Sequence, residues 1–267
     1  MQVWSISSGS SGNCYLIREG STLLLMEAGL GIRRIESELL HLGVSPAQLS
    51  AILVSHEHTD HWASALQLGR RLRVPVVCTP GTWKAGGGLG ARSTEHVPLA
   101  PGRLLRVGCL TVDAFALPHD AQEPAGFFVR SGSSSVLMAT DMGFATEEVM
   151  ELARHADLVI LEANHDVDML VRGPYPAHLK TRILGERGHL SNEDAGRAIL
   201  GMANGHQHHF WLAHLSHTNN TPRLALTSVQ DQLQRDGLAS LSISVALRDR
   251  RSLYWDSDAA MTQLPLF

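Results

Sequence analysis

The chain has 267 residues and a mass of 29.0 kDa, which is long enough for one large domain or two small ones. Hydrophobic residues at 44% and charged residues at 18% are typical of a folded globular protein, and the net charge of -4 gives no general attraction to polyanions. No apolar run reaches the roughly 18 residues that a membrane span needs, and no secretory signal is visible at the N-terminus. We therefore expect no membrane association and a cytoplasmic location.

Cysteine, arginine and histidine usage narrows the chemistry. Cys14, Cys78 and Cys109 are odd in number and far apart, so we expect buried, reduced thiols and no cysteine-based zinc site. Among 22 basic residues only Lys84 and Lys180 are lysines; the arginines could bind phosphate oxygens, but a genome-wide codon bias is the favoured explanation. Histidine reaches 15 residues, and imidazole is both the commonest metal ligand and the side chain that exchanges protons near neutral pH. The positions of the histidines therefore decide the chemistry.

The predicted elements begin with short strands joined by tight turns and continue as alternating strands and helices. The first block has strands at 3–7, 14–18 and 22–26, a helix around 32–42, a strand at 51–55, a helix at 61–72, a strand at 74–79 and a glycine-rich loop at 86–90. The second has strand-rich stretches at 104–117, 126–131 and 134–139, a helix near 146–154, a strand at 157–162, helices near 176–185, 192–204 and 222–237, strands at 209–213 and 241–246, and a last edge strand at 254–255. No linker or repeat divides this pattern, so we expect one domain, residues 1-267, of the mixed α/β class.

Four side chains of metal-ligating type lie within six residues, directly after an apolar strand. His56, His58, Asp60 and His61 follow the core of the strand predicted at 51–55. Residues two apart in extended backbone project to the same side, so the first two histidines can converge on one ion, and a turn into the next helix lets the other two side chains face a second ion. A polar loop with chance histidines does not account for this density, and we predict a metal site.

The pattern His-x-His-x-Asp-His after a core strand resembles the first signature of the metallo-β-lactamase superfamily, and the resemblance extends over nearly the whole chain. It implies an α/β fold of the four-layered αββα sandwich type, in which two mixed β-sheets flanked by helices hold two metals. His119 would complete the first site, Asp141 would bridge the two ions, and His214 would complete the second; each could also be an ordinary polar residue at a strand end, and Asp141 a helix cap. The implied ligand set is His56, His58, Asp60, His61, His119, Asp141 and His214.

Shorter segments resemble the YycJ (WalJ) family, which is similar to transfer-RNA 3′-processing nucleases and acts on phosphate esters. The sequence departs from that family's pattern at Glu27, where relatives usually carry Asp before Ala-Gly. The interval between Asp141 and His214 is too short for the nucleic-acid-clamping domain that larger processing nucleases carry there, so a nuclease of this length would be compact. The segments that carry the resemblance are residues 7–14 (SSGSSGNC), 162–166 (EANHD), 188–192 (GHLSN), 214–216 (HLS) and 219–220 (NN).

His189 is the predicted proton donor. It directly precedes a segment, 191–194, that resembles a capping box, which would fix the imidazole near a helix N-terminus. By resemblance to the transfer-RNA nucleases, it protonates the leaving alkoxide and makes up the catalytic set with Asp60 and Asp141; the alternative is a residue of the capping loop alone. Glu162 and His165 follow a strand end, and a role in orienting the metal ligands and the absence of such a role are equally supported.

The remaining candidates have structural explanations that are favoured. The glycine- and serine-rich loop at 8–12 could present N–H groups to a phosphate, although simple turn formation is preferred. Arginine clusters at 70–73 and 248–251 suit solvated surfaces, and with five Trp and three Tyr the chain has few platforms for stacking bases. We expect a solvated surface at His206, His208, His209 and His217, and structural roles for His41, His96, His155 and His178.

Three functions compete. The first is a binuclear metal-dependent hydrolase of phosphodiester bonds, a nuclease and specifically a DNA exonuclease of the YycJ/WalJ type, in which a metal-bridging water is acidified from ~15.7 toward ~7. The second is a metal-dependent hydrolase of a small phosphodiester, ester or thioester on the same fold. The third is a non-enzymatic metal-binding protein, which a seven-ligand set with an acidic bridge disfavours. We expect two divalent ions, zinc or manganese, and nucleic acid, preferably DNA, as substrate; the natural substrate, the native metal and the oligomeric state stay open.

Overall fold

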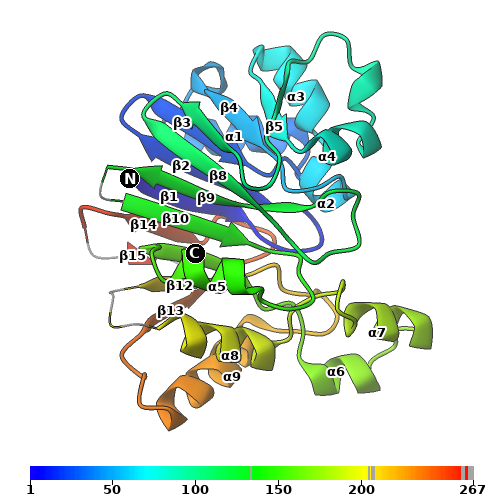
Figure 1. Ribbon diagram of the computed structural model, residues 1–267, viewed down its shortest axis with the longest axis vertical. Coiled ribbons are helices and arrows are strands. Elements are labelled where there is room, and N and C mark those ends of the chain that lie inside the picture. The colour runs from blue at the N-terminus through cyan, green and yellow to red at the C-terminus, as the bar shows by residue number, and fades with distance from the viewer. Residues whose placement is uncertain (133, 204, 206–207, 260–261, 264–267) are drawn as a thin grey trace.

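The computed structural model describes residues 1–132, 134–203, 205, 208–259 and 262–263. In this part of the chain two β-sheets lie face to face and helices cover their outer faces (Figure 1). The strands of the first sheet are β1 (Gln2–Ser7), β2 (Cys14–Glu19), β3 (Thr22–Met26), β4 (Ala51–Leu53), β5 (Val76–Cys78), β6 (His96–Pro98), β14 (Leu253–Asp256) and β15 (Thr262–Gln263). The strands of the second sheet are β7 (Leu104–Val107), β8 (Leu110–Ala116), β9 (Ala125–Ser131), β10 (Ser134–Ala139), β11 (Leu158–Glu162), β12 (His209–Ala213) and β13 (Ser242–Val245).

The helices divide between the two sheets. Those that follow strands of the first sheet are α1 (Ile32–His41), α2 (Thr59–Trp62), α3 (Ala65–Leu72), α4 (Pro80–Ala85) and the single 3-10 turns η1 (Pro46–Gln48) and η2 (Gly88–Gly90). Those that follow strands of the second sheet are α5 (Glu147–Ala153), α6 (Val167–Arg172), α7 (Ala177–Ile183), α8 (Asn192–Met202) and α9 (Pro222–Arg235). Among the described residues, no helix combines the length and apolarity needed to cross a membrane.

Alternating side chains along the buried strands produce the layers. In β3, Leu24 and Met26 point into the apolar layer between the sheets, whereas Leu23 and Leu25 point into the layer beneath α1 and α3. β11 alternates in the same way, between the inter-sheet layer and a layer beneath α5, α8 and α9. Both sheets are thus apolar on both faces, and the predicted αββα sandwich is confirmed.

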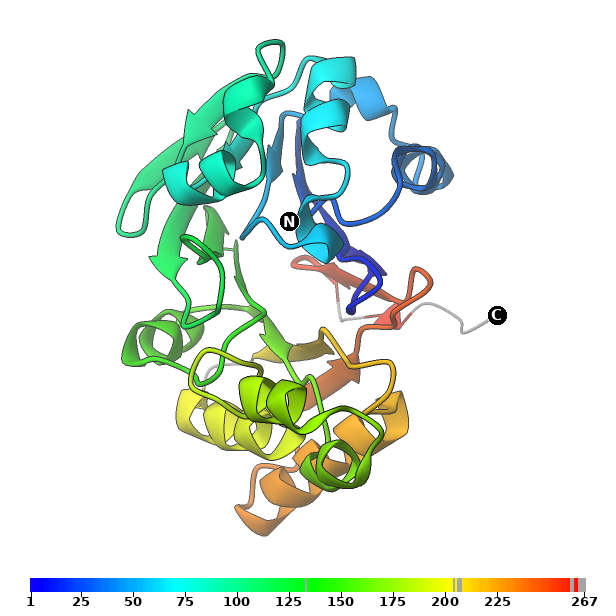
Figure 2. The same ribbon diagram turned by 90° about the vertical axis from the view of Figure 1, so that its right-hand side faces the viewer.

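Strand direction places the functional residues along one edge of the sandwich. β3 to β6 pair in parallel, as do β10 to β13, so the carboxyl ends of these strands lie on a common side of each sheet. β8 ends at the same edge as β10, because both run antiparallel to β9. Figure 2 looks onto this edge, with the helices of the first sheet above it and those of the second below.

Several elements differ from the prediction. The helix expected at 61–72 is divided into α2 and α3, because the N–H of Ser64 donates to the carbonyl of Ala28 (2.9 Å) and its hydroxyl to the carbonyl of Leu30 (2.6 Å). The stretch expected at 104–117 is the hairpin β7–β8, which turns at Gly108 with a φ of 57°. The strand at 254–255 is present as part of β14, but it lies inside the sheet because β15 pairs with it. The helices α4 and α6 and the strand β6 were not anticipated.

The cysteines are free thiols, as expected, but their burial differs from the prediction. Cys14 and Cys78 are buried, whereas Cys109 is exposed. Cys109 lies in the turn between β7 and β8, where its thiol donates to the carbonyl of Glu19 (3.2 Å). A turn between two short strands leaves no apolar layer to cover this side chain.

Candidate metal centre

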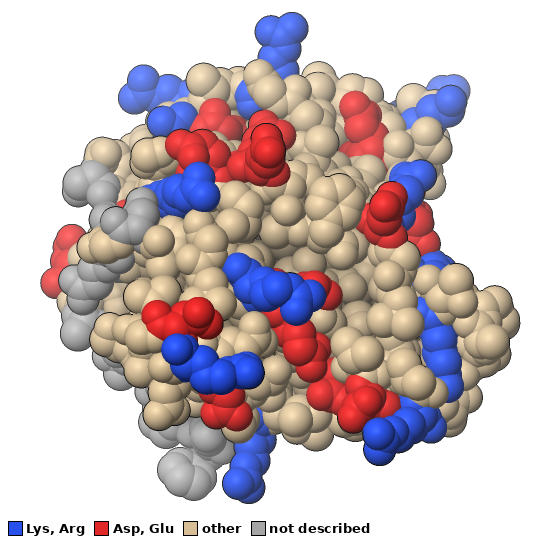
Figure 3. All heavy atoms as spheres, turned by 60° about the horizontal axis from the view of Figure 1, so that its bottom comes forward, with Lys and Arg blue, Asp and Glu red and all other residues tan. Residues whose placement is uncertain are grey.

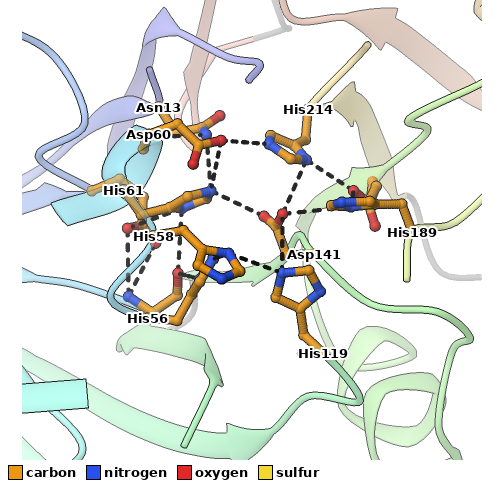
Figure 4. A network of polar contacts seen from close by, with 12 residues as sticks. Asn13, His56, His58, Asp60, His61, His119, Asp141, His189 and His214 are labelled. Atoms are coloured by element: carbon orange, nitrogen blue, oxygen red, sulfur yellow. Dashed lines mark hydrogen bonds and ion pairs between the residues drawn. The ribbon is translucent and has the colours of Figure 1, made fainter. Parts of the chain in front are cut away.

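The predicted ligands converge at the carboxyl edge of the sandwich (Figure 4). In each of four sets of described side chains, the ligand atoms lie within 4.8 Å of one another. The sets are His56, His58 and His119; His56, His61 and Asp141; Asp60, His61 and His214; and Asp141, Glu162, His189 and His214. The first and third sets correspond to the two predicted sites, and Asp141 lies between them. The fourth set adds Glu162 and the predicted proton donor.

The first set is a cluster of three imidazoles. Nε2 of His56 and Nε2 of His119 lie 3.0 Å and 3.3 Å from Nδ1 of His58. Nδ1 of His119 lies 3.1 Å from the carbonyl oxygen of Gly188, so it carries the proton that this contact requires. Nε2 of His119 then has a lone pair directed toward the other two rings, and Asp141 Oδ1 lies 3.8 Å from it. This is the arrangement in which a second partner fixes the tautomer of a metal-ligating histidine.

The second set mixes imidazoles and carboxylates. Nε2 of His61 lies 3.1 Å from Oδ2 of Asp141 and 3.6 Å from Oδ2 of Asp60. Nε2 of His214 lies 3.2 Å from the same Asp60 oxygen, and its Nδ1 lies 3.3 Å from Oδ1 of Asp141. Oδ1 of Asp141 also lies 3.8 Å from Nε2 of His119, so this carboxylate has neighbours in both predicted sites, as a bridging ligand requires.

The buried carboxylates of the centre favour positive charge on the groups around them. Burial by itself would lower the pKa of His214, but the carboxylates of Asp141, Asp60 and Glu162 raise it to about 10. Burial likewise opposes charge on His61, and the neighbouring carboxylates raise its pKa well above the usual value. Oδ2 of Asp141 is buried and accepts no hydrogen bond from the described residues. A buried oxygen facing imidazole nitrogens, within a set of nitrogen and oxygen donors, fits a divalent metal such as zinc.

Glu27, where the sequence departs from the family pattern, supports the metal loop. Its carboxylate is fully buried, accepts from the N–H of Ser55 (3.2 Å) and lies 3.3 Å from Nδ1 of His61. The next two residues contact α2. Ala28 N donates to the carbonyl of His61 (2.8 Å), and Gly29 packs so closely that a Cβ there would lie 1.7 Å from the carbonyl oxygen of Asp60. A longer carboxylate than the usual Asp therefore still reaches the imidazole that it orients.

Backbone strain is concentrated at this centre. Glu27, Asp141 and His214 have φ values of 64°, 63° and 54°, and Arg73 is the one other non-glycine residue with a positive φ in the described chain. Each of the three follows the end of a strand, and the left-handed conformation turns its side chain toward the cluster. Such residues cost on the order of 1 kcal/mol each and persist where the surroundings hold them, as at functional sites.

His189 and Glu162 form a second polar unit beside Asp141. Nδ1 of His189 donates to Oε1 of Glu162 (2.8 Å), which also accepts from Nδ1 of His214 (2.9 Å). The other Glu162 oxygen accepts from the N–H groups of Met142 (2.9 Å) and Leu190 (3.1 Å). Burial opposes ionisation of Glu162, yet the two imidazoles lower its pKa to about 2. Burial opposes charge on His189 too, and Glu162 and Asp141 raise its pKa above the usual value.

Glu162, the last residue of β11, and His165, three residues later, have different roles. Glu162 orients His189 and His214, so it supports the centre directly. His165 is buried, and neither of its ring nitrogens has a hydrogen-bond partner among the described residues. Its carbonyl accepts from Asn192 N (2.9 Å), which ties the backbone after β11 to the start of α8.

The prediction of a solvated surface is wrong for His208. This residue is buried, and its Nδ1 donates to the carbonyl of Ala156 (2.7 Å). It precedes β12, so it lies at the opposite end of that strand from His214. His217 is exposed as predicted, His209 is half-buried, and His206 lies outside the described residues.

The four histidines predicted to be structural are not part of the cluster. His41, His155 and His178 are exposed. His96 is stacked on Trp83, with the ring centroids 4.4 Å apart, and it helps to cover the outer apolar layer of the first sheet.

Two supporting residues were missed, Ser8 in the glycine- and serine-rich loop at 8–12 and Asn13 directly after it. The hydroxyl of Ser8 accepts from His214 N (2.8 Å), and Nδ2 of Asn13 lies 3.0 Å from Nε2 of His61. Asn13 Oδ1 accepts from Gly9 N (2.8 Å), so the loop folds over this side chain. The small, polar composition of the loop was the available signal, but it is equally typical of an ordinary turn.

Comparisons with known proteins agree with this geometry. Residues 22–215 match the model of the β-lactamase superfamily domain. The exodeoxyribonuclease WalJ of Streptococcus pneumoniae is 33% identical over 238 residues, which cover 87% of this chain and 88% of that protein. The exodeoxyribonuclease YycJ of Bacillus anthracis is 32% identical over 234 residues, which cover 87% of this chain and 89% of that protein.

Solved structures share the fold at lower identity. The metallo-β-lactamase fold protein YhfI from Bacillus subtilis has a TM-score of 0.72 at 18% identity and covers 95% of this chain and 98% of its own. The short form of human tRNase Z has a TM-score of 0.65 at 15% identity and covers 94% of this chain and 98% of its own. The chain belongs to the β-lactamase superfamily, within the family of the exodeoxyribonucleases WalJ and YycJ.

Proposed function

We propose that the protein is a metal-dependent phosphodiesterase that degrades DNA as an exonuclease, with His189 as the proton donor. The observation that carries the proposal is the hydrogen bond of 2.8 Å between His189 and the fully buried Glu162, beside the histidine and carboxylate cluster. The relatives WalJ and YycJ, named exodeoxyribonucleases, support DNA as the substrate. A thioesterase has less need for such a proton donor, because a thiolate is a far weaker base than an alkoxide and leaves without protonation.

Two divalent ions, zinc or manganese, belong to the proposal. His56, His58 and His119 would hold one ion, Asp60, His61 and His214 would hold the other, and Asp141 would bind both. Bound there, such ions polarise a phosphoryl group and activate water.

The side chains outside this ligand set move and hold protons. Nδ1 of His189 keeps its proton in the hydrogen bond to Glu162, which fixes the ring, and the Glu162 carboxylate raises the pKa of the imidazole against the effect of burial. Nε2 makes no hydrogen bond to the described residues and is the atom that can protonate the departing oxygen. Glu162 stays ionised, since the neighbouring imidazoles and two backbone N–H groups stabilise its charge.

The geometry leaves one alternative assignment for His189. The set of Asp141, Glu162, His189 and His214 also has ligand atoms within 4.8 Å of one another, so His189 could bind a metal itself. A ligand and a proton donor respond differently to removal, and this difference makes the assignment testable.

We predict that His189→Ala leaves the metal content unchanged and lowers the rate of DNA hydrolysis roughly 10²- to 10⁴-fold, the usual contribution of a positioned general acid. Hydrolysis of bis(p-nitrophenyl) phosphate falls far less, because nitrophenolate needs little protonation to leave. Both rates and the metal content by elemental analysis are measured on the same preparations. His178→Ala, which truncates an exposed histidine of α7, serves as the control and keeps both activities.

Two results would contradict the acid role. If the rates of hydrolysis of both substrates fell equally, His189 would have a structural role. If the variant lost metal, His189 would be a metal ligand. Wild-type turnover of an ester or thioester, without turnover of either phosphodiester, would replace the nuclease proposal by the alternative hydrolase.

A further inference from the structure

The face of the protein that Figure 3 shows has no broad cationic patch that would attract DNA. On the face shown in Figure 3, basic and acidic side chains are interspersed rather than gathered by sign, and the net charge of the chain is -4. Binding of a polyanion to this surface therefore depends on a few placed groups near the reacting phosphate rather than on long-range attraction. Two exposed side chains near the metal centre, those of Arg187 and Phe144, are suited to contact a bound nucleic acid.

The first is Arg187, two residues before His189. Nε and Nη2 of its guanidinium donate to the carbonyl oxygen of His119 (3.0 Å and 2.8 Å), and Nη2 also lies 3.4 Å from the carbonyl of Ala121. The side chain is exposed and makes no ion pair with a carboxylate of the described residues, in contrast to Arg182, which pairs with Asp120. An arginine held in place by backbone carbonyls, with uncompensated charge, is suited to bind a phosphate.

The second is Phe144, three residues after Asp141. Its side chain is 47% exposed, and it is the one aromatic among the large exposed hydrophobic residues of the described chain. Three residues of chain span at most about 11 Å, so this ring cannot lie far from the centre. The exposed ring is therefore accessible to a ligand bound at the centre.

The two residues lie on segments that touch each other. Gly143 packs directly on the loop that carries Arg187, since a Cβ on Gly143 would lie 2.3 Å from the carbonyl carbon and oxygen of Glu186. The N–H of Gly143 also donates to the carbonyl of Pro118 (3.0 Å), next to His119. Phe144 and Arg187 are thus each one residue from a shared contact, on the side of the centre where His189 lies.

We propose that Phe144 and Arg187 form a nucleotide subsite, in which the ring stacks on a base and the guanidinium binds a phosphate next to the one being cleaved. The inference rests on the proposed nuclease function and deepens it, because it assigns single-stranded nucleic acid, or a frayed end, as the form that enters the site. A base in a duplex is already stacked, whereas an unpaired base exposes a face to an aromatic ring.

The test for Phe144 is a binding measurement that does not depend on turnover. Metal-loaded protein is titrated into a fluorescein-labelled single-stranded DNA with phosphorothioate linkages, and into a strand of equal length whose sugars carry no bases. We expect the wild type to prefer the strand with bases roughly tenfold or more, Phe144→Ala to lose that preference, and Phe144→Trp to keep it. Leu104→Ala, which truncates an exposed leucine of β7, is the matched control and keeps the preference.

The test for Arg187 is the salt dependence of the same binding. Removing one phosphate contact on single-stranded DNA lowers the slope of log K against log salt by about 0.7, and we expect this change for Arg187→Gln but not for Arg187→Lys. Arg235→Gln is the control, because Nε of Arg235 also donates to a backbone carbonyl (3.1 Å) far from the centre. Metal analysis of each variant shows whether His119 has kept its position.

The outcomes separate the subsite from the nuclease proposal. Equal wild-type binding of the two strands, no binding at all, or an unchanged preference in Phe144→Ala would overturn the stacking role. An unchanged salt slope in Arg187→Gln would overturn the phosphate contact. If no phosphodiester is hydrolysed while base-dependent binding is lost in Phe144→Ala, the nuclease function fails and the subsite stands.

Discussion

Among the single residues of the centre, Asp141 has contacts that no other predicted ligand reproduces. Its Oδ2 faces His61 at 3.1 Å, and its Oδ1 lies 3.3 Å from Nδ1 of His214 and 3.8 Å from Nε2 of His119, which belongs to the other predicted site. Burial would raise the pKa of this carboxyl group, but the surrounding imidazoles hold it well below the usual value. A permanently ionised carboxylate between two groups of imidazoles is suited to reduce the repulsion between two cations.

We predict that Asp141→Ala lowers the metal content from about two ions to one or fewer per chain and weakens the affinity for the rest roughly 10²-fold or more. Phosphodiesterase activity should be lost with the metal. Asp113→Ala, which removes a half-buried carboxylate of β8 that pairs with Arg130, is the control and keeps both. Full metal content with full activity in Asp141→Ala would refute the bridging role.

The buried imidazole of His165 makes the stability of the protein depend on pH. Burial lowers its pKa from the usual 6.5 to about 4, so the unfolded chain takes up a proton in this interval that the folded chain does not. Stability from the neutral ring is therefore complete above about pH 6.5 and is lost as the pH falls toward 4, by on the order of 3 kcal/mol.

We predict that His165→Gln has a smaller loss of unfolding free energy than the wild type between about pH 7 and about pH 4.5, as measured by urea denaturation. Protonation of the other histidines affects both proteins. The difference between their pH dependences of unfolding free energy therefore reports His165 alone. The same pH dependence of unfolding free energy in wild type and variant would show that this residue is not buried in its neutral form.

At the level of elements, the turn after β3 and the helix α2 act as one unit. Glu27, Ala28 and Gly29 contact Ser55, His61 and Asp60, which belong to the segment after β4. The position of the second predicted metal site therefore depends on a turn that contributes no ligand.

We predict that Gly29→Ala weakens metal binding and destabilises the protein by roughly 1 to 3 kcal/mol, because its Cβ would lie 1.7 Å from the Asp60 carbonyl oxygen and the backbone must shift. Gly31→Ala is a matched control, since a Cβ there meets nothing within 4 Å. Metal affinity by competition with a chelator and the urea midpoint are compared for both variants. Equal behaviour of the two would mean that the turn tolerates displacement.

The elements also show what the sequence could and could not predict. The density of ligand-type residues at 56–61, directly after an apolar strand, predicted a metal site, and the resemblance to the superfamily implied the ligands that follow the other strands. The split between α2 and α3 could not be predicted, since it depends on hydrogen bonds from Ser64 to a turn 34 and 36 residues earlier. The burial of His208 is similar, because its partner is the carbonyl of Ala156, which is distant in sequence. The periodicity of hydrophobic residues predicts which face of a helix or strand is apolar. It does not predict which polar group, distant in the sequence, a side chain will contact.

Over the whole molecule, the centre joins the two sheets. His56, His58, Asp60 and His61 follow a strand of the first sheet, whereas His119, Asp141 and His214 follow strands of the second. Both proposed metal sites draw ligands from both halves, so a bound ion ties together two sheets that otherwise meet through their apolar layer. Metal binding then contributes to the stability of the whole sandwich and not only to that of one loop.

We predict that removal of metal by a chelator lowers the melting temperature, and that zinc or manganese restores it. An ion present at about 100 times its Kd stabilises the folded state by roughly 2.7 kcal/mol, which in a protein of this size corresponds to a shift of roughly 5 to 10 °C per site. Asp141→Ala, with a weakened centre, should respond less to the chelator.

Hydrogen exchange measured in parallel shows where the metal acts. Because each proposed site has ligands from both sheets, the segment around α2 and the segments after β8, β10 and β12 should lose protection together when the metal is removed. Loss confined to the segment around α2 would mean that the ions are bound by the first sheet alone, and it would contradict the shared centre.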